Sequence, residues 1–133
     1  MTTKPPVEIW RLIDAHTGGF NSQSPDVFLS VFADNAIIID GIAPYRWLSP
    51  NAPAQWLSDV EKWRKANGVI EEHLSYEMGF WTVEGDHAYA VVSGTLTVKL
   101  RNQSVIRTGT LAYTFAKNDG TWKIGAQAWG RTL

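Results

Sequence analysis

The pattern of apolar and polar residues changes its period near the middle of the chain. In the first half, apolar residues recur at helical spacing in three stretches that follow Pro5, Pro25 and Pro50. Residues 69–131 instead alternate between apolar and polar positions, which is the two-residue period of a strand. The pattern therefore predicts three N-terminal helices packed against a largely antiparallel sheet, which is the α+β class.

The boundaries of the three helices follow from turn-forming residues. The first is predicted to begin at Pro6 and to end at Gly18, and the second to run from Pro25 to Asp34. The third is predicted to end just before Gly68 and carries one apolar face beside a charged one. That apolar face consists of Trp56, Leu57, Val60 and Trp63.

A short apolar run lies between the second and third helices. Residues 36–39 read Ala-Ile-Ile-Ile and are bounded by turn formers, so we expect a strand that is buried on both faces. Asp40 follows it directly. A carboxylate at the end of a buried strand must be paired, reach water or have a raised pKa, so Asp40 is the first candidate for chemistry.

Four successive strands are predicted over residues 70–81, 87–100, 105–116 and 121–131, with short turns that indicate an antiparallel meander. Glycines inside these strands mark expected bulges or kinks. A strongly bent sheet wrapped against helices leaves a cone-shaped hollow, so the sequence predicts a pocket. The glycines are Gly79, Gly94, Gly109 and Gly125.

Composition narrows the class of protein. The 133 residues suit one domain, 1–133, and the net charge of −1 gives no reason to expect a nucleic acid or an acidic membrane as partner. The chain has no cysteine, no N-terminal apolar segment and no membrane-length apolar run, which favours a cytoplasmic protein. Seven tryptophans suit the lining of an apolar cavity.

Motifs for cofactors and metals are not found in the sequence. There is no phosphate-binding glycine loop, no dinucleotide-binding fingerprint and no nucleophile elbow. His16, His73 and His87 do not combine with carboxylates at a metal-ligand spacing. We therefore expect no cofactor and no metal site.

The order of elements and two short motifs resemble the nuclear transport factor 2-like superfamily, and within it the SnoaL-like and ketosteroid isomerase-like proteins. The motifs are F-A-D-N-A-I-I-I-D at residues 32–40 and G-T-W-K-I at residues 120–124. The resemblance covers nearly the whole chain. It implies a cone-shaped α+β roll whose curved sheet packs against three helices.

The resemblance also implies roles for single residues. In the steroid isomerases the aspartate that ends this strand is the general base, and Asp40 stands at that position. Those enzymes also use a helix tyrosine and a protonated strand aspartic acid as donors to the enolate oxygen, and these positions align with Leu12 and Leu111. Classical ketosteroid isomerase activity is therefore not expected, unless other side chains supply donors. The candidates are His16, Tyr45, Tyr113 and Trp129.

Strand alternation and the resemblance together predict the lining of the hollow. We expect ligand contacts from Trp56, Tyr89, Arg107, Leu111, Tyr113, Gln127, Trp129 and His16. Two of these have a plainer interpretation: Arg107 as a solvated or ion-paired strand residue, and His16 as a side chain that favours the negative end of its helix. For Asp40 the plainer interpretation is a cap on the turn at Gly41, or a partner of Arg46 or Arg107.

Two functions remain open. The first is a cofactor-independent isomerase, cyclase or lyase that acts on a hydrophobic carbonyl compound, with Asp40 as acid or base. The second is a non-catalytic domain of the same fold that binds a small hydrophobic molecule or dimerises. In either case a homodimer is expected through the convex face of the sheet. That face is predicted to carry Val92, Leu96, Val98, Ile106 and Ala112.

Overall fold

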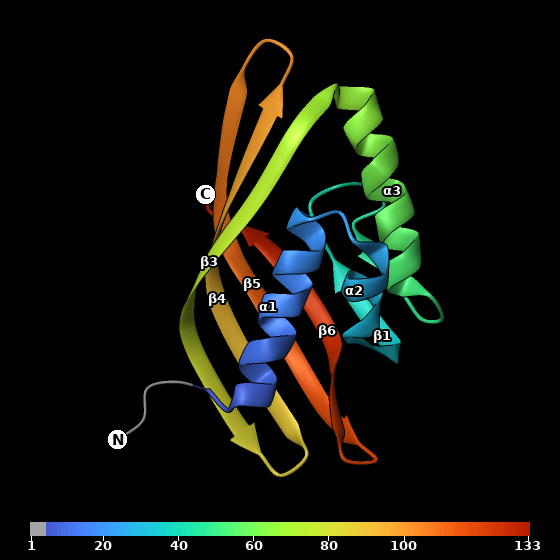
Figure 1. Ribbon diagram of the computed structural model, residues 1–133, viewed down its shortest axis with the longest axis vertical. Coiled ribbons are helices and arrows are strands. Elements are labelled where there is room, and N and C mark those ends of the chain that lie inside the picture. Colours follow the sequence, from blue (N-terminus) through green and yellow to red (C-terminus); the bar gives the residue numbers. More distant parts are fainter. Residues whose placement is uncertain (1–4) are drawn as a thin grey trace.

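The computed structural model describes residues 5–133, in which three helices flank one six-stranded sheet (Figure 1). Residues 1–4 of the predicted domain lie outside the described residues. They belong to the N-terminal stretch in which the sequence shows no apolar segment. The helices are α1 (Val7–Asn21), α2 (Pro25–Ser30) and α3 (Ala52–Asn67). The strands are β1 (Phe32–Ile39), β2 (Arg46–Trp47), β3 (Val69–Glu84), β4 (His87–Leu100), β5 (Ser104–Asn118) and β6 (Thr121–Arg131).

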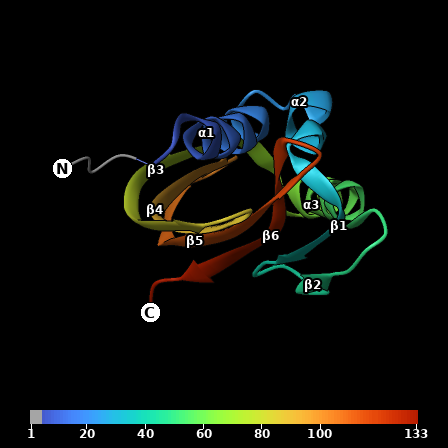
Figure 2. The same ribbon diagram turned by 90° about the horizontal axis from the view of Figure 1, so that it is seen from below.

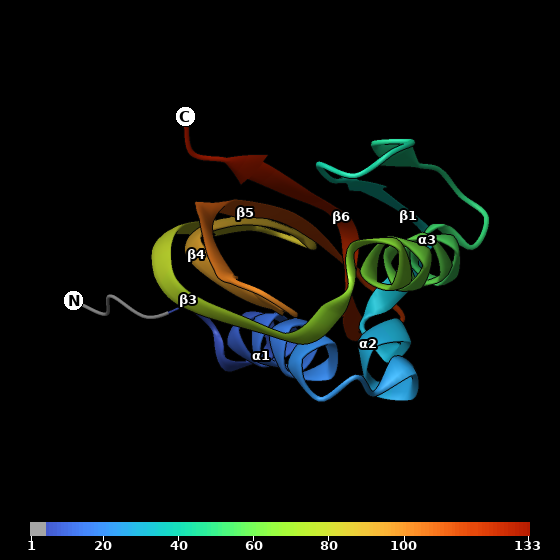
Figure 3. The ribbon, with the colours of Figure 1, turned by 90° about the horizontal axis from the view of Figure 1, so that it is seen from above.

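The sheet has the strand order β2-β1-β6-β5-β4-β3. All neighbouring strands are antiparallel except β1 and β6, which are parallel, so the sheet is mixed. The sheet curls around α1, which covers its concave face (Figure 2). Seen from the opposite end, α3 lies beside β1 at the other side of the molecule (Figure 3). The predicted meander of four strands and the α+β class are confirmed.

Glycines produce two of the irregularities that bend the sheet. The pairing register shifts between Met78 and Phe80, at Gly79, and again between Thr114 and Phe115, opposite Gly125. An extra residue in one strand increases the local twist and bends the strand. The bulges predicted at these two glycines are therefore confirmed.

The last hairpin closes on a turn that glycine favours. Asp119 and Gly120 have φ angles of 51° and 78°, the conformation of a two-residue hairpin turn whose twist matches that of the flanking strands. The turn predicted between residues 117 and 120 is thus present. It places β6 beside β5 along its whole length.

Two helix ends differ from the predictions because tertiary contacts override local signals. The second helix ends at Ser30, and the chain then becomes a strand: the carbonyl of Val31 accepts the Ile124 N–H at 2.8 Å, and Phe32 pairs with Ile124. The first helix continues through Gly19 to Asn21. A Cβ at Gly19 would lie 2.9 Å from the backbone nitrogen of Phe28, so this glycine serves the contact between α1 and α2 instead of ending the helix.

The prediction that residues 36–39 are buried on both faces is wrong. Ile38 is fully buried, whereas Ile37 and Ile39 are 38% and 48% exposed. The helices cover the concave face of the sheet alone, so alternate residues of β1 point outward. A run of apolar residues cannot reveal which face remains uncovered.

The predicted composition of the convex face is also partly wrong. In the β4–β5 register Leu96 lies opposite Arg107 and Val92 lies opposite Leu111, so both point to the concave side, as does the buried Val98. Ile106, which is 64% exposed, and Ala112 do lie on the outer face. Opposed residues of an antiparallel pair share one face, and the hairpin register decides which face.

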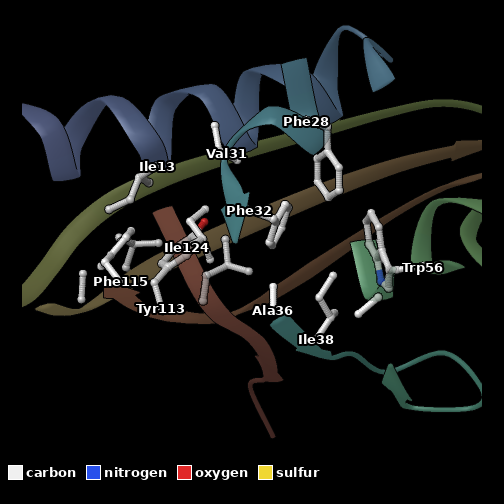
Figure 4. Close-up of a cluster of buried hydrophobic side chains, with 14 of the residues drawn as sticks. Ile13, Phe28, Val31, Phe32, Ala36, Ile38, Trp56, Tyr113, Phe115 and Ile124 are labelled. Carbon is white, nitrogen blue, oxygen red and sulfur yellow. The ribbon is translucent and has the colours of Figure 1, made fainter. Parts of the chain in front are cut away.

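The hydrophobic core fills the space between α1, α2 and the concave face of the sheet (Figure 4). Its largest fully buried side chains come from both helices and from four strands. Burial of this kind stabilises the fold by about 25 cal/mol for each Å² of apolar surface removed from water. These side chains are Tyr113, Phe28, Phe115, Ile9, Ile13, Ile38, Ile124 and Val92.

Candidate functional site

Asp40 reaches the concave face because it continues the alternation of β1. Ala36 and Ile38 are fully buried on that face, and Asp40 is the next residue of the same parity. The chain then turns, with the Asp40 N–H donating to the Tyr45 carbonyl at 3.1 Å and β2 pairing back onto β1. The carboxylate therefore stands at the edge of the core.

Two donors hold the Asp40 carboxylate. The Gly41 N–H donates to Oδ1 at 2.6 Å, and the indole Nε1 of Trp56, on α3, donates to Oδ2 at 2.8 Å. The capping of the turn at Gly41 is thus confirmed. Asp40 also lines two adjoining pockets, so a residue that caps the turn still faces a cavity.

No described cation pairs with Asp40. The ion pairs within residues 5–133 join Asp59 to Lys62, and Arg64 to Glu61 and Glu72. The pairing with Arg46 or Arg107 considered from the sequence is therefore wrong. Burial raises the pKa of Asp40, and the hydrogen bonds from Gly41 and Trp56 oppose that rise.

The inner of the two pockets is small and largely apolar, with a volume of about 70 Å³. Its polar groups are the side chains of His16, Asp40 and Gln127, which come from α1, the end of β1 and β6. Aromatic and aliphatic side chains close it. They are Phe20, Trp56, Leu74, Leu96, Leu111 and Trp129.

His16 is held by a buried tyrosine. Its Nδ1 lies 2.8 Å from the hydroxyl of Tyr113, and the two rings meet edge to face with their centroids 5.3 Å apart. Burial lowers the pKa of His16 to about 3, so the imidazole is neutral at pH 7. Burial also raises the pKa of Tyr113, so its hydroxyl keeps its proton.

The tautomer of His16 depends on which atom donates in its hydrogen bond with Tyr113. The Tyr113 side chain is fully buried and its hydroxyl contacts Nδ1 of His16, so the hydroxyl proton is satisfied if it is donated to Nδ1. Nδ1 then carries no proton, and Nε2 carries it. Nε2 takes no part in that hydrogen bond, and the ring that carries it lines the inner pocket.

This arrangement corrects two predictions about α1. His16 does not lie at the negative end of the helix, because α1 continues to Asn21 and buries the ring beside Phe28 and Phe32. Leu12 is not the helix position that faces Asp40. It lies along a shallow groove with Trp122, whereas His16, one turn further along the helix, faces the pocket.

The outer pocket is wider, with a volume of about 430 Å³, and its lining includes the exposed residues Asn67 and Gln103. It shares Asp40, Trp56 and Trp129 with the inner pocket, so the two form one cavity with an inner and an outer chamber. Arg107 and Arg131 line the outer chamber from β5 and β6. The concave placement predicted for Arg107 is therefore correct.

Trp129 lines both chambers and lies close to the sheet. A Cβ at Gly109 would be 2.8 Å from its indole ring, and a Cβ at Gly94 would be 3.1 Å away. Gly94 and Gly109 are directly opposed in the β4–β5 pair. These two glycines therefore form the floor on which the indole rests, a role different from the bulge predicted for them.

The structure places most of the predicted ligand contacts around this cavity and one of them outside it. Trp56, Leu111, Gln127, Trp129, Arg107 and His16 line the cavity, and Tyr113 lies behind His16. Tyr89 does not take part: it is 41% exposed on the outer face, where its ring meets Phe80. Tyr89 lies opposite Thr114, so the β4–β5 register directs it away from the concave side occupied by its neighbours in sequence.

Sequence reasoning missed several lining residues. Phe20 lies beyond the predicted end of the first helix, and Arg131 lies at the end of the last strand. Leu96 was assigned to the wrong face. The turn after β4 contained the signal for Leu96: the Leu100 N–H donates to the Gln103 carbonyl, and counting four residues away from this pair on each strand reaches Leu96 and Arg107.

Within residues 5–133, no three histidine or acidic side chains lie close enough together to hold a metal ion. The described part of the chain also contains no helix of the length and apolarity that a membrane crossing requires.

Comparison with known proteins identifies relatives by structure alone. No protein-family model matches the sequence, and a search of curated proteins gives no match. A structure described as a putative aromatic ring hydroxylase from Novosphingobium aromaticivorans superposes with a TM-score of 0.78 at 15% identity, over 98% of this chain and 93% of that one. The type 3 hexachlorocyclohexane dehydrochlorinase LinA from Novosphingobium barchaimii gives 0.77 at 15% identity, over 95% and 85%.

A nuclear transport factor 2-like superfamily protein from Salmonella enterica gives a TM-score of 0.76 at 16% identity, over 95% of this chain and 89% of that one. At such identities the likeness shows the fold alone. It confirms the predicted α+β roll.

Proposed function

We propose that this chain, which has the nuclear transport factor 2-like fold, is a cofactor-independent enzyme that moves a proton on a hydrophobic carbonyl compound. Asp40 is the base and the neutral His16 is the donor to the carbonyl oxygen. The observation that carries the proposal is that the Asp40 carboxylate and the His16 ring line the same inner pocket of about 70 Å³. A base and a donor that face one small space can act on adjacent atoms of one substrate.

Asp40 has the properties that proton transfer requires. Its raised pKa makes the carboxylate a stronger base than an exposed aspartate, and the hydrogen bonds from Gly41 and Trp56 hold it in position. In the proposed step a carbon next to the carbonyl gives its proton to Asp40 while the electron pair of that bond moves onto the carbonyl oxygen. The proton then returns to the same or another carbon, so the sequence of steps is redox neutral.

His16 provides the group that receives the negative oxygen. With Nδ1 occupied by the Tyr113 hydroxyl, the Nε2–H is the donor available to the pocket. A neutral imidazole is a suitable donor when burial lowers its pKa, because the ring does not give up its proton to a weakly basic carbonyl. A donor of this kind contributes about 3–4 kcal/mol to the stability of the transition state.

The apolar walls of the cavity indicate the kind of substrate. Leucine and tryptophan side chains surround the polar groups of the inner pocket, which suits a ring or branched hydrocarbon body. One structural neighbour is named as a dehydrochlorinase of hexachlorocyclohexane, which is itself an apolar ring compound. That likeness supports the size and polarity of the substrate and says nothing about the reaction.

The proposal is tested by Asp40→Asn. The assay measures exchange of α-hydrogens for deuterium in D2O, by mass spectrometry, across a panel of cyclic ketones and enones. We expect the wild type to exchange at least one of them and Asp40→Asn to slow that exchange by about 100-fold or more. Asp59→Asn is the matched control, because Asp59 also accepts an indole hydrogen bond, from Trp47 at 2.8 Å, but lies outside the cavity.

The alternative is a non-catalytic binding domain that uses the same cavity. It is favoured if members of the panel bind but exchange no faster with the wild type than with Asp40→Asn. Binding without exchange would remove Asp40 from the catalytic role.

We also propose a homodimer through the outer face of the sheet, with a corrected set of residues. A row of apolar side chains crosses five strands, because each member pairs with the next across the sheet. No member is charged, so two copies of the row meet without like-charge repulsion. The row consists of Ile39, Ala128, Ala112, Val91 and Phe80.

A further inference from the structure

The outer chamber contains two cations that protein carboxylates do not neutralise. Arg107 and Arg131 both line it, and neither takes part in an ion pair among residues 5–133. Glu72 also lines the chamber, but its carboxylate contacts the guanidinium of Arg64. The remaining acid is Asp40, at the boundary with the inner pocket.

The two arginines belong to the same part of the sheet. Arg131 pairs with Gly109, and Arg107 lies two residues from Gly109 on β5, so both side chains project from the concave face as diagonal neighbours. Diagonal neighbours on one face are about 7–8 Å apart at their Cα atoms, which long side chains bridge with ease. Two guanidinium groups can therefore converge on one anionic group.

Apolar surface connects the arginines to the proposed base. The indole of Trp129, which rests over Gly94 and Gly109, lines the outer chamber with the arginines and the inner pocket with Asp40. Leu96 and Val98 continue this surface on β4. A molecule that fills both chambers would thus meet cations at one end, an apolar wall along its body and Asp40 with His16 at the other end.

We infer that the substrate carries a single carboxylate, bound by Arg107 and Arg131, on an apolar ring-containing body whose carbonyl end enters the inner pocket. Guanidinium groups pair with carboxylates through two parallel hydrogen bonds. With Asp40 ionised, the two unpaired arginines and Asp40 together carry a net charge of +1. A monoanion therefore neutralises the cavity, whereas a dianion such as a phosphate monoester leaves an excess negative charge beside Asp40. The inference rests on the proposed function for the orientation of this molecule but not for the anion site itself.

The test compares two probes that differ in charge and hardly in shape, 2-naphthylacetate and 2-naphthylacetamide. Binding to the intact protein is measured by calorimetry at low salt. We expect the wild type to bind the carboxylate at least about 10-fold more tightly than the amide, because hydrogen bonds between charged groups are stronger than those to a neutral amide. Added NaCl is expected to weaken binding of the carboxylate and not of the amide.

Variants locate the effect. Arg107→Gln and Arg131→Gln are each expected to weaken binding of the carboxylate by about 10-fold and to leave the amide unchanged. Arg11→Gln, on the outer side of α1, is the control with the same loss of charge. Equal affinity for the two probes, or carboxylate binding that survives both variants, would overturn the inference.

The result is separable from the test of the proposed function. Asp40→Asn is expected to keep the preference for the carboxylate probe, because it removes the base and not the arginines. Loss of exchange in Asp40→Asn together with no preference between the probes would retain the enzyme and reject the anionic substrate. The reverse outcome would retain the anion site and reject the proton transfer.

Discussion

The indole N–H of Trp56 donates to Oδ2 of Asp40 at 2.8 Å, and so joins α3 to the end of β1. The ring of Trp56 is stacked on Phe28 with the centroids 5.3 Å apart, which fixes the direction of the donor. The proposed base is therefore positioned by a helix that is distant from it in sequence. This contact has a measurable consequence for the pKa of Asp40.

Trp56→Phe keeps an aromatic ring against Phe28 and removes the donor. Because the hydrogen bond favours the ionised carboxylate, its loss is expected to raise the pKa of Asp40 above the already raised value of the wild type. Carboxyl ¹³C NMR titration measures this pKa. Trp47→Phe removes the equivalent indole donor to Asp59 and is expected to leave the titration of Asp40 unchanged. A lower pKa for Asp40 in Trp56→Phe would contradict the role of the indole.

His16 makes stability depend on pH. Its pKa is about 3 in the folded protein against 6.5 in the unfolded chain, so below pH 6.5 the unfolded state takes up a proton that the folded state does not. The contribution of His16 is fully present above pH 6.5 and is lost on acidification at about 1.4 kcal/mol per pH unit, as pH falls towards 3.

Urea unfolding measures the free energy of unfolding of the wild type and of His16→Asn between pH 7 and pH 4. The contribution of His16 is the difference between the two pH dependences. Asparagine keeps an acceptor for the Tyr113 hydroxyl without titrating. His73→Asn, at an exposed position of β3, is the control and is expected to retain the pH dependence of the wild type. Parallel curves for the wild type and His16→Asn would show that His16 is not buried in its neutral form.

The floor beneath Trp129 tolerates no side chain at Gly109. In Gly109→Ala the new Cβ would lie 2.4 Å from the Gly130 carbonyl oxygen and 2.8 Å from the indole. We expect a loss of about 1–3 kcal/mol in the free energy of unfolding and a change in tryptophan fluorescence as the indole moves.

Gly18→Ala is the opposite case, because a Cβ at this position in α1 meets no atom within 4 Å. It is expected to stabilise the protein by about 0.5–1 kcal/mol, since alanine is the better helix residue. If Gly109→Ala were as stable as the wild type with unchanged fluorescence, the close packing of Trp129 on the sheet would be wrong.

The outer face of the sheet predicts the oligomeric state. Ala112 lies in the middle of the apolar row, between Val91 and Ala128. Light scattering at micromolar concentration is expected to give a dimer mass for the wild type and a monomer mass for Ala112→Lys, because the lysines of two copies would meet at the centre of the interface. Asn102→Lys, in the exposed turn after β4, is expected to remain dimeric. A monomeric wild type would refute the proposal.

Much of the site was accessible from sequence because it depends on local alternation. Residues 32–40 predicted a strand with a carboxylate at its end, and the parity of Ala36, Ile38 and Asp40 is enough to direct that carboxylate inward. Along β5 alternation put Arg107 and Leu111 on one face, and the family resemblance identified that face as the concave one, where the structure places both residues. The inward direction predicted for Tyr89 on β4 is wrong. The register with a neighbouring strand, and not the strand's own pattern, decides which of its alternate residues face the concave side.

The sequence by itself determined the order of the three helices and of the five longer strands, and the position of Asp40 at the end of one of them, but it did not contain the two-residue strand β2 as a signal. It marked Gly79, Gly94, Gly109 and Gly125 alike as sites of a bulge or kink, of which Gly79 and Gly125 have one. These features depend on side-chain periodicity and on backbone conformations that a few neighbouring residues specify. Only the tertiary structure decided that His16 pairs with Tyr113, that Trp56 holds Asp40, and that Trp129 rests on Gly94 and Gly109. Each of these contacts joins segments that no local pattern relates, and packing of the helices on the curved sheet brings them together.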